Sequence, residues 1–320
     1  MYQINFNQPL HIHFIGIGGI SMSALAEILL KNHFAVSGSD AKESEMTTHL
    51  RSLGATIAIG QSASNITDDI DLVVYTAAIH PDNEELQEVG KKNIPSITRA
   101  ELLGQIMANY KTPIAISGTH GKTTTTSMLS TICLEASEDP TITVGGILDA
   151  IKGNIRVGHS DIFITEACEY TNSFLSFYPK TAIILNVEED HMDFFKDIDD
   201  IRSSFHRFAA LLPKDGALVI NKNIEKMETI TEGLSCNIIT YSEVQEADYS
   251  AANIAFDALG NASFDLVKYG ENIGRRVRNN NITHKKCLSL LFLAYLFYYS
   301  LIFYRFFPFP SRRTAPETKK

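Results

Sequence analysis

Tryptophan is absent from this 320-residue sequence, and its four cysteines, Cys133, Cys168, Cys236 and Cys287, lie far apart without a CxxC pair. This spacing excludes a disulfide framework and a zinc site built on paired cysteines, and it is typical of a reducing compartment. An excess of basic residues is also lacking, because the formal net charge is −9. Proteins that bind nucleic acid are normally basic, so no nucleic-acid partner is expected. The N-terminus lacks the basic and apolar stretches of a signal peptide, which predicts a cytoplasmic protein.

Apolar runs alternate with helical patterns along most of the chain. Such alternation indicates parallel βαβ units and a doubly wound sheet, so we expect an α/β protein. The length is sufficient for two domains, and we place them at residues 1–110 and 111–275. Strands are predicted at 11–16, 34–39, 71–76, 94–98, 114–117, 162–165, 181–186, 217–220 and 238–241. Helices are predicted near 22–29, 45–53, 83–92, 99–109, 122–134 and 198–212.

A phosphate-binding loop is predicted between the strand at 114–117 and the helix that follows it. Glycines at such a position let backbone N–H groups converge on an anion at the helix N-terminus. A lysine can then reach the β- and γ-phosphates, and the next hydroxyl can bind Mg²⁺. The complete P-loop pattern would have a glycine at Ile116, so the match is to a shorter loop. The predicted ATP-binding residues are Gly118, Thr119, His120, Gly121, Lys122, Thr123 and Thr124.

Two acidic segments, at 166–175 and 186–193, follow predicted strands. Open α/β sheets bind ligands at the carboxyl ends of their strands, and Mg²⁺ prefers oxygen ligands, so Thr123 and Glu166 can share a magnesium ion. A lone histidine such as His191 is more often a surface residue, and the acids at 188–193 are equally compatible with a solvated loop. The sequence therefore predicts a magnesium site but does not assign each acid.

A second glycine-rich turn lies between the strand at 11–16 and its helix. Gly16, Gly18 and Gly19 resemble a dinucleotide-binding fingerprint, and Asp40 follows about twenty residues later. The third glycine of that fingerprint is replaced by Ser21. Taken alone, the turn favours an NAD-dependent oxidoreductase, but a single glycine-rich turn is weak evidence.

The segments GTHGKTTT and GIGGISMS together resemble the Mur ligase family, whose members build peptidoglycan precursors with ATP. The histidine before Gly-Lys is similar to the branch that acts on UDP-N-acetylmuramate. The resemblance implies that the first glycine turn binds the diphosphate of a UDP-sugar. The UDP-sugar site that it implies consists of Gly16, Gly18, Gly19, Ser39, Asp40, Thr76, Glu169 and Tyr170.

The resemblance also implies a fold, a reaction and its cofactors. A Rossmann-like domain precedes a P-loop-type α/β ATPase domain. ATP converts the muramoyl carboxylate into an acyl phosphate, which the amine of L-alanine then attacks. Lys122, Glu166 and His191 are the implied catalytic residues. The implied Mg²⁺ ligands are Thr123, Glu166 and His191.

The chain departs from the family after Gly274. The family's third domain has no counterpart in residues 276–320, which hold nine basic residues and one acid. An uncharged stretch at 287–304 is long enough for a membrane anchor. We expect instead an aberrant, frameshifted or fragmentary terminus that leaves the second domain incomplete and the chain with little ligase activity. A non-catalytic UDP-sugar-binding remnant and an NAD-dependent oxidoreductase are the alternatives.

Overall fold

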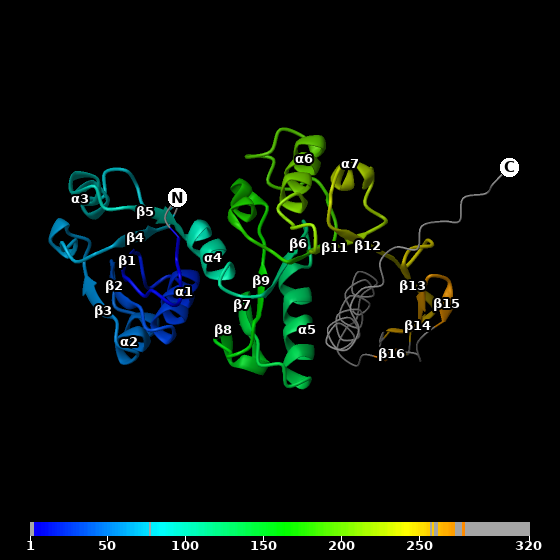
Figure 1. The fold of residues 1–320 in the computed structure, drawn as a ribbon, viewed down its shortest axis with the longest axis horizontal. Coiled ribbons are helices and arrows are strands. Elements are labelled where there is room, and N and C mark those ends of the chain that lie inside the picture. Colours follow the sequence, from blue (N-terminus) through cyan, green and yellow to red (C-terminus); the bar gives the residue numbers. More distant parts are fainter. Residues whose placement is uncertain (1–2, 77, 257, 259–261, 273–276, 279–320) are drawn as a thin grey trace.

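The computed structural model describes residues 3–76, 78–256, 258, 262–272 and 277–278. Two sheets with their helices lie along the long axis of the molecule, and helix α4 (Arg99–Met107) lies between them (Figure 1). The tail predicted at 276–320, with its apolar stretch at 287–304, lies outside the described residues apart from Val277–Arg278.

The first sheet has five parallel strands in the order β3-β2-β1-β4-β5. Its central strands are almost continuously buried, as expected where helices cover both faces of a parallel sheet. The strands are β1 (His11–Ile15), β2 (Ala35–Asp40), β3 (Thr56–Ile59), β4 (Leu72–Tyr75) and β5 (Ser96–Thr98). The other helices are α1 (Ile20–Lys31), α2 (Glu45–Ser52), η1 (Ala63–Asn65) and α3 (Glu84–Lys92).

The second sheet has eleven strands within the described residues, in the order β15-β14-β13-β12-β11-β10-β6-β9-β7-β8, with β16 beside β14. The strands from β13 to β7 are parallel neighbours, and antiparallel pairs flank them. The parallel strands are β6 (Thr112–Ser117), β7 (Thr141–Leu148), β9 (Ile162–Glu166), β10 (Thr181–Ile184), β11 (Ala217–Asn221), β12 (Asn237–Ser242) and β13 (Tyr249–Phe256). The flanking strands are β8 (Gly153–Arg156), β14 (Ala262–Lys268), β15 (Glu271–Asn272) and β16 (Val277–Arg278). The helices are α5 (Lys122–Glu135), η2 (Asp149–Ile151), η3 (Tyr170–Ser176), α6 (Ile198–Ala209) and α7 (Glu228–Thr231).

The structure confirms the α/β fold and every strand and helix predicted above, with shifts of a few residues at their ends. It adds β3, β7, β8 and the strands after β12. Polar, glycine or alanine residues interrupt these segments, and such residues have low strand propensity. β7 contains Gly145-Gly146, for example, and β13 reads YSAANIAF.

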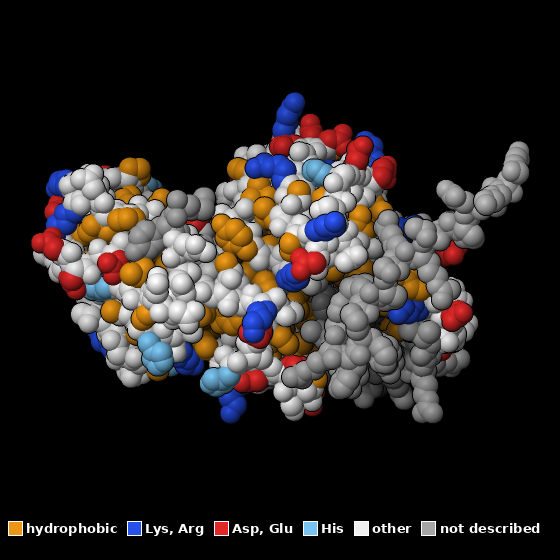
Figure 2. Space-filling view, viewed as in Figure 1, with side chains coloured by type: hydrophobic (Ala, Val, Ile, Leu, Met, Phe, Trp, Pro, Cys, Tyr) orange, Lys and Arg blue, Asp and Glu red, His pale blue; other side chains and the backbone are white. Residues whose placement is uncertain are grey.

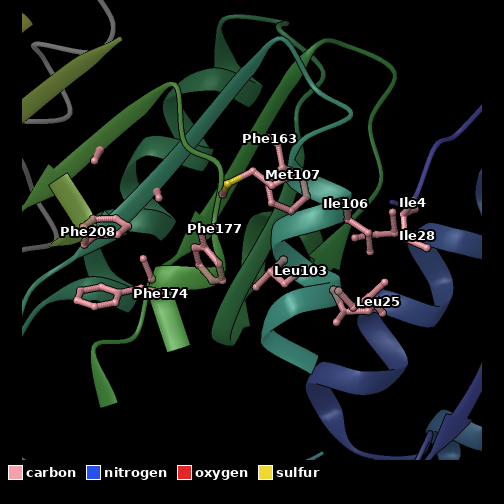
Figure 3. Close-up of a cluster of buried hydrophobic side chains, with 14 of the residues drawn as sticks. Ile4, Leu25, Ile28, Leu103, Ile106, Met107, Phe163, Phe174, Phe177 and Phe208 are labelled. Carbon is pink, nitrogen blue, oxygen red and sulfur yellow. The ribbon is translucent and has the colours of Figure 1, made fainter. Parts of the chain in front are cut away.

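Helix α4 joins the cores of the two sheets. Ile106 of α4 lies beside Ile28 of α1, and Leu103 lies between Leu25 of α1 and Phe177 (Figure 3). The same buried cluster includes aromatic rings from the second half of the molecule. Among these rings are Phe163, Phe174 and Phe177. The two halves of the molecule therefore share one continuous apolar core.

The segment at 110–113, which contains the boundary between the two predicted domains, is packed. The ring of Tyr110 lies 5.9 Å from that of Phe6 and 5.0 Å from that of Phe163, measured between centroids. Its hydroxyl donates to Thr141 Oγ1 at 3.1 Å. The connection is therefore held in place by contacts on both sides.

Charged side chains of both signs are interspersed on the face shown in Figure 2, which has no continuous basic stripe. Within the described part of the chain, no helix is both long and apolar enough to span a bilayer.

Candidate functional site

Two helices begin without the usual chemistry of a helix start. Among the described helices of eight residues or more, only α1 and α5 have a glycine N-cap, Gly19 and Gly121, and neither has a side-chain cap or an acid in its first turn. The other four such helices have both, with caps Ser44, Asn83, Thr98 and Asp197. A helix N-terminus carries free N–H groups and a partial positive charge. The first turns of α1 and α5 provide no complementary negative charge.

The loop before α5 has the backbone shape of a phosphate cradle. Gly118 and Gly121 have φ values of +141° and +86°, which favour glycine. A Cβ atom at Gly118 would lie 2.9 Å from Leu185 Cβ. Within the helix, the N–H of Thr125 donates to the carbonyl of Gly121. The N–H groups of residues 122–124 precede this bond and point out of the helix start.

Asn186, just beyond β10, fixes this loop. Its Oδ1 accepts from the N–H of His120 at 2.8 Å, and its Nδ2 donates to the carbonyl of His120 at 2.9 Å. The Thr119 hydroxyl accepts from the N–H of Glu188 at 2.9 Å. Asn186 was not among the predicted site residues, although its position at the carboxyl end of a strand was a signal for it.

Lys122 is surrounded by acceptors. Its Nζ donates to the carbonyls of Gly118 at 2.6 Å and Thr119 at 3.2 Å, and it pairs with Glu169 at 2.9 Å. Glu169 is buried, with 2% of its side chain exposed. His191 Nε2 lies 3.8 Å from the same carboxylate. Glu169, which we expected in the UDP-sugar site, therefore lies against the phosphate loop.

Tyr170, also predicted for the UDP-sugar site, lies beside His191. Its ring stacks on His191 with centroids 4.5 Å apart, and its hydroxyl donates to Asp193 at 2.8 Å. This hydrogen bond to a carboxylate raises the pKa of the Tyr170 phenol. The aromatic ring thus holds His191 beside the loop.

Thr123 and Glu166 provide oxygen atoms suited to Mg²⁺. The Thr123 hydroxyl donates to Glu166 Oε2 at 3.0 Å, and the N–H of Gly145 donates to Glu166 Oε1 at 2.7 Å. No three His, Cys, Asp or Glu side chains of the described residues converge as a complete metal site. The pair nevertheless fits Mg²⁺, which takes one or two protein ligands and completes its shell with phosphate and water. Of the three predicted Mg²⁺ ligands, Thr123 and Glu166 contact each other, whereas His191 contacts Glu169.

The glycine turn before α1 is shaped by the end of β2. The N–H groups of Gly16 and Ile17 both donate to the carbonyl of Ser39 at 2.9 Å. The N–H of Gly18 donates to Asp40 Oδ2 at 2.8 Å, and a Cβ atom at Gly18 would lie 2.8 Å from that oxygen. The carboxylate of Asp40 therefore closes the turn.

The residues predicted for the UDP-sugar site fall into three groups. The first gathers around the turn and comprises Gly16, Gly18, Gly19, Asp40 and Thr76. Ser39 forms the second, because its side chain is fully buried and turns away from the turn to donate to Glu85 Oε2 at 2.6 Å. Glu169 and Tyr170 form the third, in the other half of the molecule.

The β7–β8 hairpin touches both helix starts. Gly145 of β7 donates to Glu166 beside α5, and Asn154 Nδ2 of β8 donates to the carbonyl of Ile20, the first residue of α1, at 3.4 Å. The fold and these contacts define an α/β protein in which two helix starts with glycine turns lie at one hairpin.

Comparison with known proteins agrees with this geometry. The model of the Mur ligase family catalytic domain matches residues 11–111, and that of the Mur ligase middle domain matches residues 116–280. The chain belongs to the Mur ligase family.

Its curated relatives include two proteins named UDP-N-acetylmuramate–L-alanine ligase. The one from Lachnoclostridium phytofermentans is 59% identical over 285 residues, which cover 86% of this chain and 61% of the relative. The one from Lachnospira eligens is 59% identical over 272 residues, which cover 85% and 59%. The chain thus spans about 60% of the length of these relatives.

Solved structures show the same architecture. The UDP-N-acetylmuramate–alanine ligase of Thermotoga maritima matches with a TM-score of 0.74 and 27% identity, covering 91% of this chain and 65% of that one. A UDP-N-acetylmuramate:L-alanyl-gamma-D-glutamyl-meso-diaminopimelate ligase from Neisseria meningitides matches with a TM-score of 0.78 and 27% identity, covering 90% and 92%.

Proposed function

We propose that this chain binds UDP-N-acetylmuramate at the turn before α1 and Mg²⁺–ATP at the loop before α5. In this proposal it serves the ATP-dependent ligation of L-alanine to UDP-N-acetylmuramate. The observation that carries the proposal is the pair of uncapped helix starts joined by one hairpin. The names of the relatives at 59% identity support the choice of substrates.

In this proposal the domain at residues 1–110 binds the sugar nucleotide and the domain at residues 111–275 binds ATP. The free N–H groups at the start of α1 would receive the diphosphate, because both the helix dipole and the unpaired donors favour an anion there. Gly18 would stay closed against Asp40, so the turn reaches the ligand already formed. A preformed turn loses less conformational entropy on binding than a mobile one.

The proposed reaction has two steps. The muramoyl carboxylate attacks the γ-phosphorus of ATP, the bond to the bridging oxygen breaks, and ADP leaves. The amine of L-alanine then attacks the acyl carbon of the resulting acyl phosphate. Inorganic phosphate leaves, and the amine loses a proton as the amide forms.

The chain's own residues would stabilise charge in the first step. The Lys122 ammonium would exchange the carbonyls of Gly118 and Thr119 for phosphate oxygens, while Glu169 holds it at the start of α5. Thr123 and Glu166 would hold Mg²⁺, which offsets the negative charge of the polyphosphate. His191 would lie at the edge of this site, oriented by Tyr170.

The proposal is tested by calorimetric titration of the purified chain. We expect binding of UDP-N-acetylmuramate and, at a separate site, of ADP in the presence of Mg²⁺, whereas uridine should bind much more weakly because it lacks the diphosphate. NADH is the discriminating ligand for the oxidoreductase alternative. A folded chain that binds NADH but not UDP-N-acetylmuramate would refute the proposal.

Turnover is measured separately as phosphate release from Mg²⁺–ATP, UDP-N-acetylmuramate and L-alanine. Release that depends on both other substrates supports ligation by this chain. Binding of both nucleotides without any release supports the non-catalytic alternative.

A further inference from the structure

Glu85 on α3 is a fully buried carboxylate that the proposed reaction does not use. Its Oε2 accepts from the Ser39 hydroxyl at 2.6 Å, and its Oε1 accepts from Asn65 Nδ2 at 2.7 Å. Oε1 also faces His13 Nε2 at 3.7 Å. Three elements, β2, η1 and β1, therefore direct polar atoms at this one side chain.

Burying a carboxylate is unfavourable unless hydrogen bonds satisfy it, and an apolar side chain of similar size is often at least as stable. Val89, one turn further along α3, shows that this helix packs apolar residues here, because it is 2% exposed in a cluster with Ile15, Ile66, Ile70 and Val73. Stability alone therefore gives little reason for a glutamate at position 85. Its partners provide a better reason.

Both hydrogen-bond partners of Glu85 lead to the glycine turn. Ser39 is the residue whose carbonyl accepts from Gly16 and Ile17. Asn65 Nδ2 also donates to the carbonyl of Gly60 at 3.0 Å, and the N–H of Gly60 donates to the carbonyl of Asp40 at 2.8 Å. Asp40 in turn accepts from Gly18.

We propose that Glu85 is a positioning residue for the sugar-nucleotide site, an inference that rests on the proposed function. By holding Ser39 directly and Asp40 through Asn65 and Gly60, it fixes the two consecutive residues whose oxygen atoms shape the glycine turn. The turn then presents the start of α1 to the diphosphate. Glu85 itself touches no ligand, because it is fully buried.

The test uses the variants Glu85→Gln and Ser39→Ala, alone and combined, in the full chain. Glu85→Gln keeps the size of the side chain but replaces one acceptor with a donor, so it cannot accept from Ser39 and Asn65 together. Ser39→Ala removes the same contact from the other end. The control Val89→Ala weakens the packing of α3 and leaves the contacts of Glu85 in place.

Affinities for UDP-N-acetylmuramate and for Mg²⁺–ADP are measured by calorimetry, and folding is checked by thermal unfolding. We expect Glu85→Gln to weaken UDP-N-acetylmuramate binding about tenfold. This is the effect of losing one hydrogen bond to a charged group when the whole loss appears in the binding free energy. Mg²⁺–ADP affinity should stay within about twofold, and so should both affinities of Val89→Ala. The double variant should bind much like the weaker-binding single variant, because both changes interrupt the same contact between Glu85 and Ser39.

Three results would overturn the inference. Unchanged UDP-N-acetylmuramate binding in Glu85→Gln or Ser39→Ala would show that the turn keeps its shape without this contact. An equal loss at both ligand sites, or the same loss in Val89→Ala, would show a general effect on folding. If the unmodified chain binds Mg²⁺–ADP but not UDP-N-acetylmuramate, the proposed function fails and this inference fails with it.

Discussion

Gly104 of α4 lies against the backbone of η3, and a methyl group at this position tests how tightly the two halves of the protein are joined. A Cβ atom at Gly104 would lie 1.8 Å from the carbonyl oxygen of Ser176 and 3.3 Å from Phe177 Cα. Both neighbours are backbone atoms, so no side chain can rotate out of the way. The change Gly104→Ala therefore has to move α4 away from η3.

Two effects oppose each other in this variant. Alanine has a higher helix propensity than glycine by about 1 kcal/mol in a helix interior. Overpacking a core typically costs about 1–3 kcal/mol and occasionally more. The required displacement is roughly 1 Å or more, which forfeits a quarter to a half of the dispersion energy across the gap. Because the shift opens the shared core at Leu103 and Met107, we expect a net loss of at least about 2 kcal/mol.

The assay is equilibrium unfolding in urea with a thermal melt as a second probe. For a unit of this size a loss of 2 kcal/mol lowers Tm by about 4–8 °C. Gly90→Ala is the matched control, because Gly90 lies within α3 and nothing occupies the space within 4 Å of its added methyl group. That variant should be up to about 1 kcal/mol more stable than the unmodified chain. A Gly104→Ala protein as stable as Gly90→Ala would refute the close packing of α4 against η3.

Three further predictions concern the second half of the molecule. Asn186→Ala should weaken Mg²⁺–ADP binding about tenfold by calorimetry, because it frees the N–H and carbonyl of His120; an unchanged affinity would contradict this role. Lys122→Met should abolish measurable Mg²⁺–ADP binding while UDP-N-acetylmuramate titrates normally, and loss of both would contradict separate sites. Hydrogen bonds, first from Arg156, lower the pKa of Asp139 from 3.8 to about 2. The stabilisation is present above pH 3.8 and disappears as pH falls through about 2. In urea titrations, the free energy of unfolding of Asp139→Asn should therefore be lower than that of the unmodified chain above pH 3.8, by less than about 1 kcal/mol. The two free energies should agree near pH 2.

The local signals in the sequence were sufficient for the fold class and for both glycine turns. Apolar runs with a period suited to strands or helices predicted the order of most elements, because burial in a parallel sheet requires that pattern. Glycines between a strand and a helix predicted the turns before α1 and α5. At Gly16, Gly118 and Gly121 the observed φ values are positive, which a glycine adopts without strain.

The strands that the sequence missed depend on their neighbours. β7 and β13 carry glycine or alanine where a strand signal needs branched or aromatic residues, and they are extended because adjacent strands provide hydrogen-bond partners. Local propensity does not contain that information.

The same distinction between local signals and tertiary contacts applies to the candidate site. The sequence by itself determined which segments form glycine turns at helix starts, since such a turn is encoded within a few consecutive residues. Only the tertiary structure decided that Glu169 pairs with Lys122, that Asn186 holds His120, and that the Ser39 side chain turns inward to Glu85. Each of these contacts joins residues more than forty positions apart, and packing of whole strands and helices brings them together.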